Sequence, residues 1–105
     1  MKREQIAKNI VADLKELAAL TSDADGAQRV AWTPTFKKAT EWFTQKMQAA
    51  GADVWTDAAG NSWAKFAGES KECIVIGSHL DSVPDGGWLD GALGVVAGMG
   101  IGAYG

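Results

Sequence analysis

The chain has 105 residues, a formal net charge of −3 and a hydrophobic fraction of 47%, which together describe one small folded domain. Basic residues cluster no further than neighbouring pairs, which disfavours a nucleic-acid partner. No apolar run approaches the roughly 20 residues of a membrane-spanning helix, and the N-terminus lacks the apolar segment of a signal peptide. A single cysteine, Cys73, excludes an internal disulfide, so we expect a cytoplasmic protein with Cys73 buried in a strand.

The first half of the sequence predicts two amphipathic helices. Apolar residues recur at spacings of three and four between residues 4 and 20, which is the period of one helix face. Residues 21–28 are rich in serine, aspartate and glycine and predict a loop. A second helix is expected to begin at Thr33 and Pro34, because threonine caps free amides and proline suits the first helical position. Gly51 is expected to end it.

After the second helix the pattern changes to that of strands. Residues 52–57 and 61–66 predict a hairpin, and the continuous apolar run CIVIGS, residues 73–78, predicts a strand buried on both faces. The sequence therefore predicts an α/β fold, a partial α/β sandwich in which two N-terminal helices precede a three-stranded portion of a mixed sheet. Because such a sheet has an open edge, we expect the chain to self-associate through it.

The stretch GSHLDSVPDGGWLDGALG, residues 77–94, holds the residues best suited to chemistry. His79 is the only histidine and follows the predicted strand, and Asp81 lies on the same side of an extended chain. A carboxylate there can hold one imidazole nitrogen and leave the other free to bind a metal. Asp90 follows a loop rich in glycine and proline that can turn back, so the histidine and this second aspartate could share a cation.

Other interpretations of these residues remain open. A lone histidine is commonly a surface or core residue, and aspartates commonly cap turns and helices. Ser78 points away from His79 and Asp81 in an extended chain, which disfavours a nucleophilic triad. GIGAYG, residues 100–105, matches the GxGxxG dinucleotide motif, with residues 94–99 as its strand, but no helix or ribose-binding acid follows it in the sequence.

The segment GSHLDSVPDGGWLDGALGVVAG, residues 77–98, resembles the first metal-site segment of the zinc-dependent N-carbamoyl-L-amino-acid hydrolase and allantoate amidohydrolase group, in the clan of co-catalytic metallopeptidases. DGAQRVAWTP and MQAAGADVWTDAAGN extend the resemblance upstream. It implies that His79 binds one of two divalent ions (zinc, manganese or cobalt), that Asp90 bridges both, and that Asp81 is a catalytic residue orienting His79. It also implies hydrolysis of the C–N bond of small N-carbamoyl-L-amino acids or related ureido acids.

The sequence also departs from this group. The group's acidic pair, its further histidines and its inserted dimerisation domain have no counterpart in these 105 residues. We therefore expect residues 1–105 to be a truncated N-terminal part of a metallopeptidase-like catalytic domain, with weak or no metal binding. Gly98, Gly100 and Gly102 are expected to weaken a C-terminal helix by about 1 kcal/mol each. Two hypotheses stay open, a piece of a binuclear amidohydrolase and a catalytically inactive fragment or interaction module.

Overall fold

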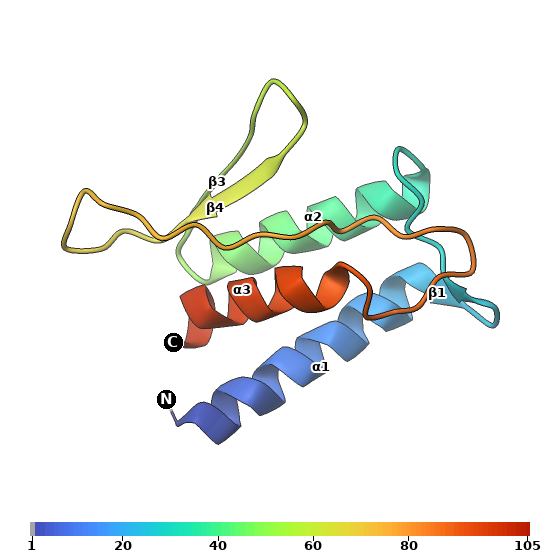
Figure 1. Cartoon of the computed structure of the whole chain (residues 1–105), viewed down its shortest axis with the longest axis horizontal. Coiled ribbons are helices and arrows are strands. Elements are labelled where there is room, and N and C mark those ends of the chain that lie inside the picture. The colour runs from blue at the N-terminus through green and yellow to red at the C-terminus, as the bar shows by residue number, and fades with distance from the viewer. Residues whose placement is uncertain (1) are drawn as a thin grey trace.

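The computed structural model describes residues 2–105 and contains three helices and two short antiparallel hairpins (Figure 1). The elements in chain order are α1 (Arg3–Thr21), β1 (Ser22–Asp23), β2 (Gly26–Ala27), α2 (Pro34–Ala49), β3 (Asp53–Thr56), β4 (Ser62–Lys65) and α3 (Ala92–Tyr104). The three helices lie side by side, and the β3–β4 hairpin projects from one end of α2. Within residues 2–105, no helix has both the length and the hydropathy of a bilayer-spanning segment.

The two N-terminal helices form where the sequence predicts them. Thr33 caps α2, because its Oγ1 accepts a hydrogen bond of 3.2 Å from the amide of Phe36. Gly51 has a φ of +93° just after the C-terminus of α2, a conformation that glycine adopts without strain. The predicted hairpin is also confirmed, with Val54 opposite Ala64 in the register of β3 and β4.

The core lies between the three helices. Its buried side chains are Leu14, Leu17, Ala39, Trp42, Met47, Ala52, Ala92, Val96 and Met99. A polar link spans the same helices. Lys46 of α2 pairs with Glu16 of α1 at 2.9 Å and with Asp13 at 3.3 Å, and the hydroxyl of Tyr104 on α3 donates to Asp13 at 2.7 Å. The hydrogen bond to Glu16 is the main reason that the pKa of Lys46 is raised, so the ammonium stays charged in this link.

The predicted three-stranded sheet is wrong, because residues 73–78 do not join the β3–β4 hairpin. They run extended along the helices and make no backbone hydrogen bond to another described segment (Figure 1). Ile74 is 92% exposed, Val75 is 70% exposed, and Cys73 is exposed rather than buried. An apolar strand is buried on both faces only when neighbouring strands cover it. Both two-stranded sheets of residues 2–105 leave this segment without such neighbours.

Helix α3 forms in spite of its glycines, and packing explains why. A methyl group at Gly98 would lie 3.1 Å from Ile76 Cγ2, and one at Gly102 would overlap the ring of Phe66. The missing side chains let the extended chain that contains Ile76 cross close to the helix. Each glycine costs a helix roughly 1 kcal/mol, and at these two positions it permits a close contact that a larger residue would exclude.

We expect the isolated chain to self-associate through the exposed segment 74–76, because an unpaired apolar strand offers backbone groups to a second copy. Sedimentation or light scattering at increasing concentration measures this association. Ile74→Lys should shift the chain toward monomer, since a lysine on an open strand opposes pairing. Val11→Lys is the matched control, because Val11 is 45% exposed but lies on the hydrogen-bonded helix α1. A wild-type chain that stays monomeric at high micromolar concentration contradicts this expectation.

Candidate metal centre

The structure brings together the three residues that the sequence singled out. His79 lies between the two aspartates, with Nδ1 3.3 Å from Asp81 Oδ1 and Nε2 3.5 Å from Asp90 Oδ2. Nδ1 also lies 3.0 Å from the backbone carbonyl oxygen of Asp81. The two aspartates therefore address different nitrogens of one imidazole ring.

The contacts at Nδ1 favour one tautomer of the neutral His79 ring. A carbonyl oxygen only accepts hydrogen bonds, so the 3.0 Å contact with the Asp81 carbonyl is a hydrogen bond when Nδ1 carries the hydrogen. In the neutral ring Nε2 then holds the free lone pair, on the side of Asp90. Histidines that bind metals are typically held in this way, with the other ring nitrogen hydrogen-bonded to a carboxylate or a carbonyl.

The distance between His79 Nε2 and Asp90 Oδ2 fits a shared cation. Two ligands about 2.1 Å from a tetrahedral zinc ion lie about 3.4 Å from each other, and these two atoms are 3.5 Å apart. An imidazole nitrogen and a carboxylate oxygen are suitable donors for zinc, manganese or cobalt. The side chains are 53% and 79% exposed, so an ion could reach them from solvent. Residues 2–105 supply these two ligands, fewer than the three or so of a catalytic zinc site.

Backbone pairing with residues 27–29 holds the loop that carries the site. The amide of Ala27 donates to the carbonyl of Gly86 at 2.8 Å, and the amide of Gly86 donates back at 3.0 Å. The amide of Ser82 donates to the carbonyl of Arg29 at 2.8 Å. The loop is thus positioned by the segment that follows α1, and not by the strand that the sequence predicted.

Gly91 determines how closely Asp90 and α3 approach His79. It has a φ of +70°, which favours glycine, and it is the N-terminal cap residue of α3. A methyl group there would overlap both the carbonyl oxygen and the imidazole ring of His79. Asp90 precedes the helix, as expected, and the absence of a side chain at the next residue lets the ring lie against the backbone.

The residue pattern did not indicate the role of Arg29, which is fully buried. Its Nε donates to the carbonyl of Leu80 at 2.8 Å, between His79 and Asp81. Burial lowers the pKa of Arg29, while the charges of Asp81 and Asp90 raise it, so both carboxylates lie within electrostatic reach of the guanidinium. The available signal was a single arginine between Gln28 and Val30, and its contact crosses about fifty residues of sequence.

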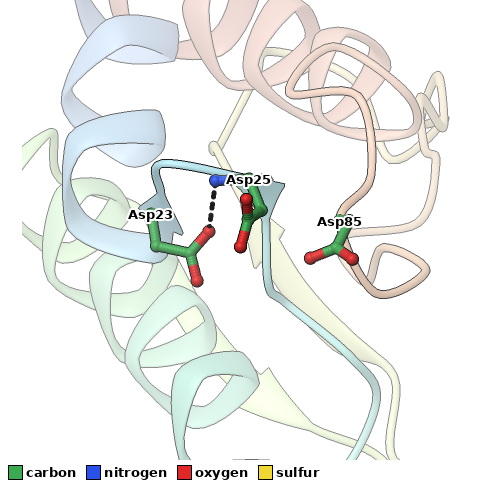
Figure 2. A group of neighbouring side chains, drawn as sticks. All are labelled: Asp23, Asp25 and Asp85. Atoms are coloured by element: carbon green, nitrogen blue, oxygen red, sulfur yellow. Dashed lines mark hydrogen bonds between the residues drawn. The ribbon is translucent and has the colours of Figure 1, made fainter.

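A second group of carboxylates, Asp23, Asp25 and Asp85, meets at the tip of the β1–β2 hairpin (Figure 2). Their oxygens lie within 4.8 Å of one another, and all three residues are exposed. Gln28 links them, since its Nε2 donates to Asp23 Oδ1 at 3.0 Å and to Asp85 Oδ1 at 2.7 Å. The bond from Gln28 is the main reason that the pKa of Asp23 is lowered. These bonds account for the group as a tie between two loops, and we assign it no ligand.

The dinucleotide interpretation of GIGAYG is excluded by the fold. Residues 94–99, its expected strand, and residues 100–104 all lie within α3. A dinucleotide site requires a strand before the glycine-rich turn and a helix after it, and neither the strand nor the turn is present here.

Comparison with known proteins gives relatives of one group. The chain is 36% identical over 95 residues to the N-carbamoyl-L-amino-acid amidohydrolase of Paenarthrobacter aurescens, which covers 89% of this chain and 23% of that protein. It is 40% identical over 76 residues to the N-carbamoyl-L-amino acid amidohydrolase of Geobacillus stearothermophilus, covering 70% and 19%. It is 33% identical over 76 residues to the allantoate amidohydrolase of Escherichia coli strain K12, covering 70% and 18%.

The resemblance predicted from the sequence is therefore confirmed, and the chain is homologous to part of the N-carbamoyl-L-amino-acid amidohydrolases and allantoate amidohydrolases. It spans about a fifth of the length of the curated relatives it matches. No family model matches the chain. No solved structure matches it either.

Gly91→Ala should displace the His79 ring, because the new methyl group occupies the space of the ring and of its backbone carbonyl. The left-handed backbone adds strain of about 1–3 kcal/mol. The ring signals of the only histidine, followed by NMR, should shift, and thermal unfolding should begin at lower temperature. Gly87→Ala is the matched control, since a methyl group there meets nothing within 4 Å. Unchanged His79 signals in folded Gly91→Ala would show that this glycine does not set the ring position.

Proposed function

We propose that His79 and Asp90 are ligands of a binuclear divalent metal centre in an amidohydrolase that acts on N-carbamoyl-L-amino acids or related ureido acids. The observation that carries this proposal is the 3.5 Å approach of His79 Nε2 to Asp90 Oδ2, in a chain whose relatives bear these enzyme names. N-carbamoyl amino acids and allantoate both carry a ureido group, so the C–N bond of that group is the proposed point of hydrolysis.

Each residue of the site would have a distinct role. His79 would give its Nε2 lone pair to one ion, and the Asp90 carboxylate, with two oxygens, would bridge both ions. Asp81 would keep the ring in place by accepting the hydrogen bond from Nδ1. Divalent ions bound there would polarise the substrate carbonyl and acidify a water molecule. The cytoplasmic location expected from the sequence stays a prediction.

A segment exchange tests the proposal in a complete enzyme. The 95 residues of the Paenarthrobacter aurescens relative that align with this chain, a stretch covering 89% of it, are replaced by their counterparts here. The chimera should release ammonia from N-carbamoyl-L-amino acids or from allantoate only when a divalent metal is present. His79→Ala and Asp90→Ala should each lower that rate by more than about 100-fold, because loss of a ligand costs more than loss of an outer-shell partner.

Cys73→Ser is the matched control for the chimera, since Cys73 is exposed and makes no contact with the site. It should leave the rate unchanged. A chimera that hydrolyses either substrate equally well after His79→Ala overturns the metal assignment. A folded chimera that loads metal but hydrolyses neither substrate class overturns the proposed reaction.

The 105-residue chain alone should show no detectable hydrolysis, even with added zinc, manganese or cobalt. It offers each ion at most two protein ligands, and the only carboxylates paired with the His79 ring are Asp81 and Asp90 among residues 2–105. The resemblance implies a glutamate general base in the complete enzymes, and loss of such a base alone costs about 10²–10⁴ in rate. Ammonia release from a panel of N-carbamoyl amino acids measures this. Metal-dependent turnover that disappears in His79→Ala would show the chain to be active and would favour ligands shared between copies.

A further inference from the structure

Arg29 is a cation buried beside the loop that carries His79. Its side chain has no measurable exposure, and no carboxylate of residues 2–105 forms an ion pair with it. Its Nη2 is buried and has no hydrogen-bond partner among residues 2–105. A buried charge without a close partner is costly.

Arg29 holds the peptide on both sides of Asp81. Its side-chain Nε donates to the carbonyl of Leu80 at 2.8 Å, and its own carbonyl accepts from the amide of Ser82 at 2.8 Å. One residue therefore fixes the groups immediately before and after the aspartate. Nη1 lies 3.4 Å from Thr21 Oγ1, which ties the guanidinium to the end of α1.

The peptide fixed in this way is the one that contacts the histidine. The carbonyl of Asp81 and its carboxylate lie 3.0 Å and 3.3 Å from His79 Nδ1. Rotation of the Leu80 or Asp81 peptide would move that carbonyl away from the ring. The two bonds from Arg29 oppose such a rotation, because each fixes one of these peptides.

We propose that Arg29 is a positioning residue for His79, because it fixes residues 80–82 so that the carbonyl and carboxylate of Asp81 face Nδ1 and leave Nε2 toward Asp90. The use of this arrangement for metal binding rests on the proposed function. The arrangement itself does not, since it is a property of the chain without metal. Arg29 acts through the backbone and through Asp81, and it touches neither ring nitrogen.

The test measures the tautomer of His79 in the metal-free 105-residue chain. Long-range ¹H–¹⁵N correlation of the ring assigns the protonated nitrogen without ambiguity, because the chain has one histidine. Spectra are recorded at alkaline pH, where an imidazole is neutral. The wild-type chain should show the Nδ1–H form. Arg29→Met should lose it in favour of a mixture with the Nε2–H form, and Arg29→Lys should do the same, because lysine lacks a donor at the position of Nε.

Thr21→Val is the matched control, because it removes the Nη1 contact of Arg29 and leaves the bond to Leu80 intact. It should keep the Nδ1–H form. Circular dichroism confirms that each variant retains its helices, and Arg29→Lys, which keeps the charge, carries the test where Arg29→Met unfolds. Folded Arg29→Met or Arg29→Lys chains that keep the wild-type tautomer overturn the proposal. So does a Thr21→Val chain that loses it.

Zinc titration of the same chains separates this inference from the proposed function. Affinity for Zn²⁺, followed through the His79 ring signals, should fall by about 10- to 100-fold in Arg29→Lys, as for other outer-shell partners. A tautomer that changes in the Arg29 variants sustains the positioning role even where the 105-residue chain binds no zinc, and the chimera then remains the test of the metal centre. Zinc bound through His79 with an unchanged tautomer in both variants overturns the positioning role alone.

Discussion

The antiparallel pairing of residues 27–29 with residues 82–86 is the constraint on which the candidate site depends. Three backbone hydrogen bonds of 2.8–3.0 Å hold the loop of residues 82–86, and the Arg29 side chain lies beside them. The residues that precede this loop do not form a strand. At about 0.5–1.5 kcal/mol each, such bonds contribute only a few kcal/mol. They nevertheless connect the end of α1 to the histidine, and through Gly91 to the start of α3. The site is therefore held by the helical core, although its residues lie on an exposed loop.

Local signals explain why the helices and the hairpin were predictable. The 3.6-residue period of α1, the cap at Thr33 and the left-handed Gly51 each act within a few residues of the structure they produce. The strand predicted for residues 73–78 was wrong because an apolar run indicates only that its residues favour burial. A strand also needs a partner, and pairing depends on residues far away in the sequence. Gly98 in α3 illustrates the same point. Its cost to the helix can be predicted from the local sequence, whereas its contact with Ile76, which lies more than twenty residues away, cannot.

The residues of the candidate site also fall into two groups, those that the sequence predicts and those that only the folded structure reveals. His79, Asp81 and Asp90 are recognisable from residue type and spacing, because metal-binding groups are few and their order along the loop sets which side of the ring they reach. Arg29 and Gly91 are not recognisable in this way. Arg29 acts through the carbonyl of Leu80, some fifty residues away in the sequence. Gly91 acts because it has no side chain where the His79 ring lies. Both roles exist only once the two loops are brought together in space.

The exposed segment and the incomplete ligand set lie next to each other in the chain. Ile76 precedes His79 by three residues, so the two are about 10 Å apart in extended chain at roughly 3.3 Å per residue. A strand that pairs with residues 74–76 would therefore lie near the loop that carries His79, whether it comes from a second copy or from elsewhere in a larger assembly. The unpaired backbone of the apolar segment and the two-ligand metal site are thus neighbouring features of one surface, and a partner strand that covers the first would change the surroundings of the second.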